Sequence, residues 1–433
     1  MKINHKTQTH HLENGLTVLT REMHHVPIVS QWIWYRIGSR NEVPGITGIS
    51  HWVEHMQFKG TPSYPIHELD AAISRNGGVW NAMTSLDWTT YYETLPANKI
   101  DIALDLEADR MTNSVFDINE VELERNVVIS EREGNQNEPL FQLSESVRKA
   151  AFAQHSYATQ VIGELVDLKA ITRADLFRHY QDYYTPNNAV LVLAGDFDTA
   201  ALLEKITNRY GGTQSNSVRT PTLLPEKTIN QTAVIEKEGP GDTIYLQISY
   251  RAPSARLDDF FSLLVLDSLL TGPSSIAMFG GGSVSNKVSR LYQQIVETDL
   301  AVAVSGGLQA TIDPYLYEIL AILPPEKNTK QVIHAIDKQI AILQDNLVKQ
   351  SEIDRAIKQA KALFAYGSES ITNQAFWMGY ASMFADHTWF DTYISRIENI
   401  TPAMVQYAAQ HYLDPSHRII GIYRPAKKEG TLH

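Results

Sequence analysis

The segment His51-Trp52-Val53-Glu54-His55 contains the residues whose types and spacing point most directly to chemistry. On an α-helix, residues four apart lie about one turn apart on the same face, so His51 and His55 can bind one metal ion through neutral imidazoles. Glu54 borders the same stripe, where a carboxylate can act as general base toward water acidified by the ion. This is the logic of the HExxH motif with its order reversed.

The third protein ligand of a catalytic zinc must come from elsewhere, because two imidazoles leave the ion one ligand short. The stretch Glu120–Glu131 is acidic and helical in pattern. Glu124 and Glu131 are two turns apart and share a face, so one can ligate while the other orients a histidine or the water. Spacing alone leaves the candidates open: Glu120, Glu124, Glu131 and Glu133.

The composition limits the kinds of protein that the chain can be. Its 433 residues, 43% of them hydrophobic, can bury more than one core, so we expect two domains. A net charge of −12 argues against a nucleic-acid partner. The absence of cysteine excludes thiolate zinc sites and disulfides. A polar N-terminus and the lack of any run of 18 apolar residues predict no signal peptide and no membrane span, and hence a cytoplasmic protein.

An internal repeat indicates how the chain is organised. Residues 171–193 and 400–422 each begin with Ile-Thr, continue as an amphipathic stretch ending in tyrosine, and reach an apolar strand after a proline. A weaker match pairs the predicted strands Val29–Arg36 and Ile244–Arg251. Because these units recur in the same order, duplication is the simplest account.

The repeat predicts an α+β fold of two homologous lobes that form a clamshell, each a mainly antiparallel sheet packed with helices. Residues 212–232 are rich in Thr, Ser and Pro and read as a linker. We therefore expect a zinc-binding catalytic lobe at 1–211 and a homologous lobe without a metal site at 233–433. The longest predicted helical stretches are 100–113, 119–134 and 328–364.

The sequence resembles the pitrilysin, insulinase and mitochondrial-processing-peptidase family of zinc peptidases, the inverzincins, over almost its whole length. Besides the duplication, three segments carry the resemblance: Gly38–Glu42 (GSRNE), Gly48–Thr61 (GISHWVEHMQFKGT) and Glu124–Glu131 (ERNVVISE).

The resemblance implies a complete HxxEH metallopeptidase centre with one Zn²⁺ per chain. By the family's spacing the third ligand is Glu131, beside His51 and His55. Glu124 becomes the acid that supports the ligands, and Glu54 the general base. All four family positions hold the required residue types.

Residues 79–95 read as two strands around a Ser-Leu-Asp turn. The resemblance implies that the first, around Asn81, Ala82 and Met83, is an edge strand to which an extended peptide adds through main-chain hydrogen bonds. An ordinary hairpin is the alternative. Such pairing inside a closed two-lobe chamber predicts short unstructured peptides as substrates.

The second lobe departs from the first at the positions of the metal site. Alignment of the lobes on Gly60 and Gly272 sets two leucines and an aspartate opposite the two histidines and Glu54. These residues are Leu263, Leu266 and Asp267.

In the family, the second lobe also supplies an arginine and a tyrosine that hold the substrate carbonyl and the developing oxyanion. The matching positions here are Val296 and Val302, whose side chains cannot donate hydrogen bonds. In the branch that resembles processing peptidase, these functions can be divided between two subunits. We therefore expect the zinc subunit of a heterodimer, with a homologous partner that bears the Arg and Tyr. A homodimer, or action in cis through Arg290 and Tyr292, is the alternative.

A glycine-rich stretch at 280–282 lacks the Gly-Lys-Ser/Thr ending of a nucleotide loop. It resembles a loop associated with substrate capture in the non-catalytic processing-peptidase subunit, and a plain connection is the alternative. Together these features predict a zinc metalloendopeptidase of short unstructured peptides. The alternative is a non-catalytic structural or assembly subunit of the same fold, against which the intact metal-site residues argue.

Overall fold

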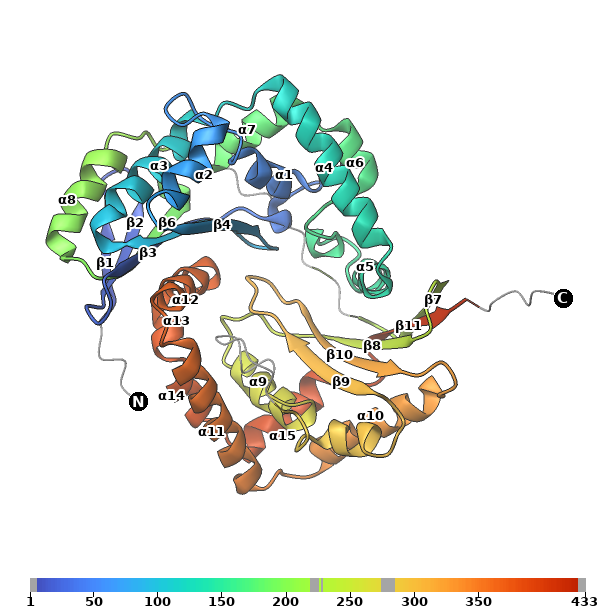
Figure 1. Ribbon diagram of the computed structural model, residues 1–433. Coiled ribbons are helices and arrows are strands. Elements are labelled where there is room, and N and C mark those ends of the chain that lie inside the picture. Colours follow the sequence, from blue (N-terminus) through green and yellow to red (C-terminus); the bar gives the residue numbers. More distant parts are fainter. Residues whose placement is uncertain (1–5, 219–225, 227–228, 274–284, 427–433) are drawn as a thin grey trace. The chain divides into compact units, whose positions relative to one another are not determined.

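The computed structural model describes residues 6–218, 226, 229–273 and 285–426. The chain packs into two compact units, each built around one sheet (Figure 1). The first unit comprises Met1–Glu133, Thr159–Leu223 and Ser368–Asp391, and the second comprises Gly134–Ala158, Leu224–Gly367 and Thr392–His433. The lobes proposed from the sequence, 1–211 and 233–433, are continuous stretches that resemble each other. The packing units instead combine segments from both lobes.

The sheet of the first unit has the order β1-β2-β6-β3-β5-β4, which leaves β4 at an edge. Only the β2–β6 pair is parallel. Every residue of β6 is buried, as expected for an apolar strand inside a sheet that is covered on both faces. The strands are β1 (Gln8–His11), β2 (Thr17–Glu22), β3 (Ile28–Tyr35), β4 (Val79–Thr84), β5 (Thr89–Pro96) and β6 (Ala189–Gly195).

The sheet of the second unit repeats this topology. Its order is β7-β11-β8-β10-β9, again with one parallel pair, β7–β11, and with β9 at the edge that β4 occupies in the first sheet. The predicted α+β fold with two homologous halves is therefore confirmed. The strands are β7 (Ala233–Gly239), β8 (Ile244–Arg251), β9 (Ala303–Leu308), β10 (Leu316–Leu323) and β11 (Arg418–Pro425).

The helix–strand repeats found in the sequence form equivalent elements. Residues 171–193 contain α7 and the start of β6, and residues 400–422 contain α15 and most of β11. Both helices begin at the expected threonines, because the side-chain oxygens of Thr172 and Thr401 accept from backbone N–H groups of the first turn. The helices from the first half of the chain are α1 (Ile49–Met56), α2 (Ile66–Ser74), α3 (Ile100–Asn113), α4 (Ile118–Gln136), α5 (Pro139–Ala151), α6 (Leu165–Ala170), α7 (Arg173–Tyr183) and α8 (Thr199–Tyr210).

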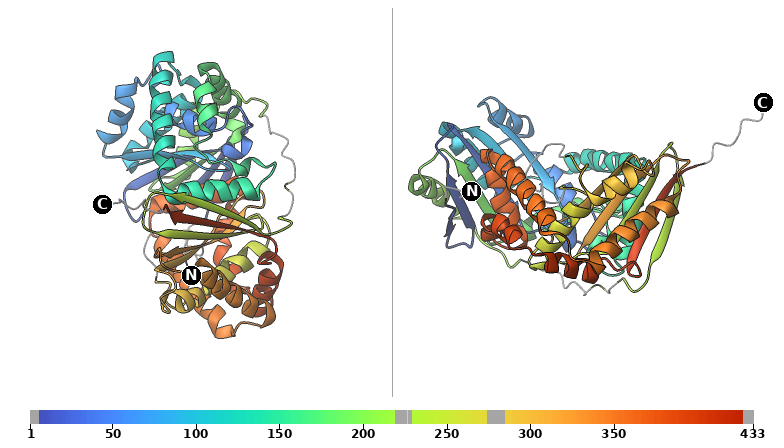
Figure 2. Two further views of the ribbon diagram at one scale, coloured as in Figure 1. Left: turned by 90° about the vertical axis from the view of Figure 1, so that its right-hand side faces the viewer. Right: turned by 90° about the horizontal axis from the view of Figure 1, so that it is seen from below.

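Each half of the chain contributes one helix to the unit that is built around the sheet of the other half. In the first unit, α1, α2, α3, α7 and α8 lie on one face of the sheet, and α12, from the second half of the chain, covers β3 and β6 on the other (Figure 1). In the second unit, α5, from the first half, lies across β7, β11 and β8 (Figure 2). Since α5 follows α4 just as α12 follows α11, the exchange is reciprocal.

Aromatic side chains fasten α12 to the first sheet. Trp32 and Trp34 of β3 lie with their ring centroids 5.2 and 5.3 Å from that of Phe376. The helix approaches so closely because Gly379 faces the Trp34 indole, and a Cβ at Gly379 would lie 2.0 Å from Trp34 Nε1. On the second sheet, Gly421 of β11 likewise faces α5.

The stretch 328–364, predicted as one helical segment, forms two helices instead. α10 ends at Asp345, and Asn346 takes an extended backbone while its side-chain amide donates to the carbonyl oxygen of Ile342 at 3.3 Å. Asparagine competes in this way for backbone groups, which ends a helix. The helices from the second half of the chain are α9 (Asp259–Leu270), α10 (Thr329–Asp345), α11 (Gln350–Gly367), α12 (Ile371–Phe384), α13 (His387–Asp391), α14 (Tyr393–Glu398) and α15 (Pro402–Tyr412).

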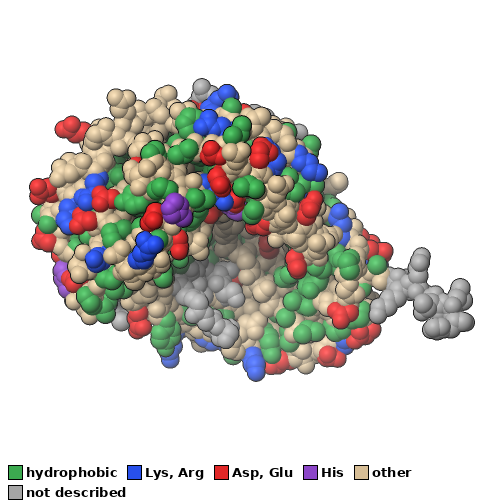
Figure 3. All heavy atoms as spheres, turned by 45° about the horizontal axis from the view of Figure 1, so that its top comes forward, with side chains coloured by type: hydrophobic (Ala, Val, Ile, Leu, Met, Phe, Trp, Pro, Cys, Tyr) green, Lys and Arg blue, Asp and Glu red, His purple; other side chains and the backbone are tan. Residues whose placement is uncertain are grey.

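Acidic and basic side chains are interspersed with apolar ones on the face drawn in Figure 3, so the negative charge of the chain is not gathered into one patch there. Among the described residues, no helix has the length and apolar character needed to cross a membrane.

We expect Gly379→Ala to lower the stability of the first unit by about 1–3 kcal/mol, because the added Cβ overpacks the contact with Trp34. Gly134→Ala is the control, since Gly134 lies in α4 with nothing within 4 Å of its Cβ position, and it should gain up to about 1 kcal/mol from helix propensity. Thermal and denaturant unfolding would measure both. A Gly379→Ala protein as stable as the wild type would contradict this account.

Candidate metal centre

The helix α1 is held at its first turn by a remote carboxylate. Gly48 precedes the helix with φ of 87° and offers no side-chain cap. The carboxylate of Glu42 accepts instead from the backbone N–H groups of Gly48 at 2.7 Å and Ser50 at 2.9 Å. Burial raises the pKa of Glu42 to about 7, although these hydrogen bonds oppose the shift. Glu42 thus satisfies the amides that any helix leaves free at its start.

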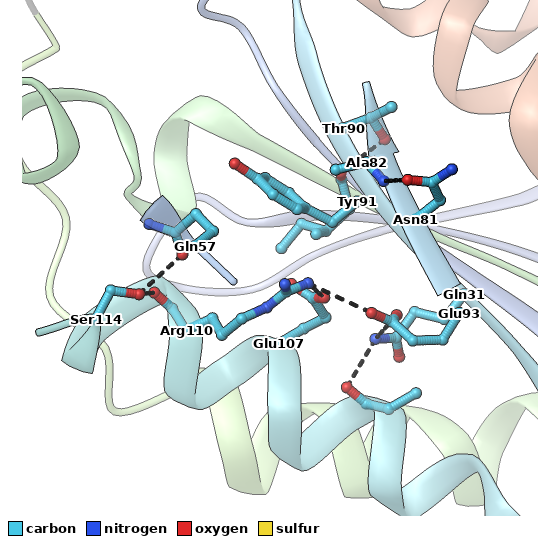
Figure 4. Close-up of polar contacts among 12 residues, drawn as sticks. Gln31, Gln57, Asn81, Ala82, Thr90, Tyr91, Glu93, Glu107, Arg110 and Ser114 are labelled. Carbon is cyan, nitrogen blue, oxygen red and sulfur yellow. Dashed lines mark hydrogen bonds and ion pairs between the residues drawn. The ribbon is translucent and has the colours of Figure 1, made fainter. Parts of the chain in front are cut away.

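The other end of α1 is anchored to Ser114, the residue that follows α3. Gln57 follows the helix, and its Oε1 accepts from the hydroxyl of Ser114 at 2.9 Å (Figure 4). The next residue, Phe58, packs against Trp80 of β4 with ring centroids 4.8 Å apart. Both ends of α1 are therefore fixed, and its histidines project from a rigid element.

The predicted ligands converge. The Nε2 atoms of His51 and His55 lie 3.3 Å apart, and Oε2 of Glu131 in α4 lies 3.9 Å from each. A tetrahedral zinc with bonds of about 2.0–2.2 Å separates its ligand atoms by roughly 3.4 Å. Among the described residues, this is the one group of three or more potential ligands whose atoms gather within 4.8 Å. Two imidazoles and a carboxylate suit zinc.

The protonation of the histidines is set by burial and by nearby acids. Burial, and then the neighbouring His55, lower the pKa of His51 to about 3, so its imidazole is neutral, as metal binding requires. For His55, burial acts to lower the pKa, but the hydrogen bond to Glu124 and the charges of the surrounding carboxylates outweigh it and raise the pKa.

Glu124 contacts the ring nitrogen of His55 that does not face His51. Its Oε1 lies 2.7 Å from His55 Nδ1, so Nδ1 carries the proton and Nε2 is left for the metal. Its Oε2 lies 2.5 Å from Nζ of Lys59. Burial acts to raise the pKa of Glu124, but the bonds from His55 and Lys59 prevail and lower it, which keeps the carboxylate ionised.

Glu54 lies in α1 between the two histidines in the sequence. Its Oε2 accepts from the hydroxyl of Thr84, at the end of β4, at 2.7 Å. Burial raises the pKa of Glu54, and the bond from Thr84 and the charge of His55 oppose the shift. A buried carboxylate held in this way has an affinity for protons suited to a general base.

The structure separates the four acidic candidates of α4. Glu131 joins the histidines and Glu124 supports His55, while Glu120 lies 3.8 Å from Lys59 Nζ and Glu133 is exposed.

Sequence reasoning assigned no role to Lys59, Thr84 or Glu42. Lys59 and Glu42 lie inside the segments that carry the family resemblance, which was the available signal, but their contacts appear only in the folded chain.

The strand β4 is an edge strand, with Asn81 exposed and Ala82 buried. The backbone N–H of Ala82 donates to the side-chain Oδ1 of Asn81 at 2.8 Å (Figure 4). The predicted peptide-binding role of Asn81, Ala82 and Met83 stays a prediction.

A buried charge cluster lies beneath this strand. Arg110 forms ion pairs with Glu107 and, at 3.4 Å, with Glu93, the β5 partner of Trp80 (Figure 4). Burial, and then the charge of Glu107, raise the pKa of Glu93 well above its usual range. The ion pairs with Arg110 offset part of the cost of burying these carboxylates.

The equivalent helix of the second unit is α9. Leu263, Leu266 and Asp267, which the alignment sets opposite the metal-site residues, are all buried. The carboxylate of Asp267 accepts from the hydroxyls of Tyr317 at 2.6 Å and Thr271 at 2.7 Å.

At the positions matched to arginine and tyrosine, Val302 is exposed and Val296 half-buried. Arg290 is paired with Glu352 at 2.8 Å. The glycine-rich stretch 280–282 lies outside the described residues.

Two family models match the chain. Residues 17–164 match the model described as insulinase, peptidase family M16, and residues 170–360 match the peptidase M16 inactive domain.

Among similar proteins, an uncharacterized zinc protease of Bacillus subtilis, YmxG, is 27% identical over 84% of this chain and 84% of its own. The mitochondrial-processing peptidase subunit beta of Dictyostelium discoideum is 24% identical over 95% of this chain and 87% of its own. The crystal structure of a protease from Helicobacter pylori superposes with a TM-score of 0.90 at 24% identity, covering 97% of this chain and all of that one.

We expect Glu124→Gln to weaken zinc binding by roughly 10- to 100-fold. A glutamine can still accept from His55, but it then turns its NH₂ group toward the ammonium of Lys59. Chelator competition would measure the zinc dissociation constant. Glu120→Gln, one turn earlier in α4, is the control and should bind zinc like the wild type. If both variants bound zinc with equal affinity, the proposed supporting role of Glu124 would be wrong.

Proposed function

Because the chain belongs to peptidase family M16, the insulinase family, we propose that it is a zinc metalloendopeptidase that binds one Zn²⁺. The observation that carries the proposal is the convergence of His51, His55 and Glu131 on one point, with Glu54 beside them on the helix of the histidines. The names of relatives support zinc and proteolysis as family properties.

The chain's own residues would share the reaction as follows. Zinc, when bound, supplies the Lewis acidity that polarises a scissile carbonyl and acidifies water. Thr84 holds Oε2 of Glu54, so the other oxygen, Oε1, takes the proton from the attacking water. Glu54 then delivers this proton to the nitrogen of the departing amine. Glu124, held by Lys59, would keep the Nε2 of His55 free to bind the metal.

The substrate proposal rests on the edge strand. An extended peptide would add to β4 at Asn81, Ala82 and Met83, and its carbonyl would replace the Asn81 side chain at the N–H of Ala82. Only a segment without stable structure of its own can pair in this way. Short unstructured peptides are therefore the proposed substrates.

We also propose that this chain is the zinc subunit of a heterodimer. The valines at 296 and 302 cannot hold a substrate carbonyl with their side chains, and Arg290, the candidate for action in cis, is paired with Glu352. A homologous subunit bearing Arg and Tyr would complete the oxyanion site. One relative is named as a subunit of mitochondrial-processing peptidase, which agrees with this arrangement.

Glu54→Gln should retain zinc and lose peptide cleavage by about 100-fold or more, because the ligands remain while the base is removed. Zinc content and cleavage of an unstructured cationic peptide would be measured in the presence of the partner. Glu204→Gln, an exposed carboxylate of α8, is the control and should cleave normally. Unchanged cleavage in Glu54→Gln would refute the base role, and a wild-type chain without zinc would favour a structural subunit.

The purified chain alone should cleave at least about 100-fold more slowly than the chain mixed with an Arg/Tyr-bearing partner, since the partner supplies the oxyanion donors. Initial rates with and without the co-expressed partner would measure this. A complex containing the Glu54→Gln chain is the control, because its loss of activity assigns the reaction to this zinc centre. A single chain as fast as the complex would exclude the divided site.

A further inference from the structure

The proposed metal ligands come from two helices, and one short segment contacts both. The side chain of Glu131 is 45% exposed, so its position depends on the backbone of α4 that bears it. We infer that Gly163–Leu168, named here the bridging segment, holds α1 and α4 at the separation that metal binding requires, with Thr47 and Arg125 as positioning residues. The inference rests on the proposed metal centre.

On the α1 side, the bridging segment holds the loop that leads into the helix. The Oδ2 atom of Asp167 accepts from the backbone N–H groups of Gly45 and Thr47, both at 3.1 Å, and from the Thr47 hydroxyl at 2.6 Å. The Thr47 hydroxyl oxygen accepts in turn from the backbone N–H of Glu164 at 2.9 Å. Asp167 is buried, so these bonds are shielded from water and are costly to lose.

Backbone packs directly on backbone at this contact. Gly48 and Gly163 have φ of +87° and +83°. A Cβ on Gly163 would lie 2.4 Å from the carbonyl oxygen of Thr47, and one on Gly48 would lie 2.5 Å from that of Ile162. Because no side chain cushions the contact, a displacement of the bridging segment displaces the first turn of α1.

On the α4 side, two arginines hold the two ends of the bridging segment. Arg132 donates from Nε to the carbonyl oxygen of Gly163 at 2.9 Å, and Arg125 donates from Nη1 to that of Leu168 at 2.7 Å. Arg125 also lies over the ring of Trp52 in α1, with Cζ 4.7 Å from the ring centroid.

The two arginines are seven residues apart and share a face of α4. Each directly follows a glutamate of the proposed site, Glu124 or Glu131. The same two turns therefore present carboxylates to the histidines and guanidinium groups to the bridging segment. Because Arg125 and Arg132 bind the bridging segment and that segment binds the loop before α1, the position of Glu131 is linked to the position of α1.

The test separates positioning from general stability. Thr47→Val removes the hydroxyl that links Asp167 and Glu164, and Arg125→Met removes the bond to Leu168 while keeping a stem over Trp52. Arg209→Met is the matched control, because Arg209 is 23% exposed against 17% for Arg125 and pairs with aspartates of α3. Chelator competition would give each zinc dissociation constant, and unfolding of the metal-free proteins would give their stability.

We expect zinc to bind about 10-fold or more weakly in Thr47→Val and Arg125→Met, and within about 2-fold of wild type in Arg209→Met. In the metal-free protein, hydrogen exchange of the α1 amides should be faster in Thr47→Val and unchanged in Arg209→Met. Wild-type zinc affinity in both bridging variants, or unchanged exchange of α1, overturns the inference. A wild-type chain that binds no zinc overturns the proposed function instead, and the exchange measurement still tests whether the bridging segment orders α1.

Discussion

The constraint on which the rest of the first unit depends is the separation of α1 and α4. The three proposed ligand atoms come from two helices and lie 3.3–3.9 Å apart. The protein meets this constraint with buried hydrogen bonds at both ends of α1 and with arginines along α4. A rigid ligand set loses little entropy when it binds a metal, so such supports strengthen binding without adding ligands.

The buried acids Glu54, Glu93 and Glu124 each have hydrogen-bond or ion-pair partners, and the pKa of each shifts according to these partners and to burial. Glu124 stays ionised because His55 and Lys59 donate to it, whereas burial raises the pKa of Glu54. Burial and the neighbouring charge of Glu107 raise the pKa of Glu93 well above its usual range. The surroundings of these carboxylates, whose intrinsic acidities are similar, thus set the direction in which each pKa shifts.

The duplicated sheets show how one topology supports two outcomes. Both have a central antiparallel set, one parallel pair and a free edge, yet α1 carries a polar stripe while Phe260–Leu270 of α9 is buried throughout. An apolar helix buried on every side can stabilise a core but offers no open ligand face. The reciprocal exchange of α5 and α12 covers the remaining face of each sheet, and close approach at Gly379 and Gly421 makes that packing possible.

By itself, the sequence determined the features that depend on local spacing. The i, i+4 pattern placed His51 and His55 on one face, the threonine caps marked the repeated helices, and the repeat order predicted two similar sheets. Helical spacing left four glutamates of α4 open, the family resemblance selected Glu131, and the tertiary structure places Glu131 beside the histidines. Tertiary structure alone decided the contacts of Glu42 and Lys59 and the packing of α5 and α12. The physical reason is that helix and strand periodicity is set by neighbouring residues, whereas contacts between distant segments are set by how whole elements pack.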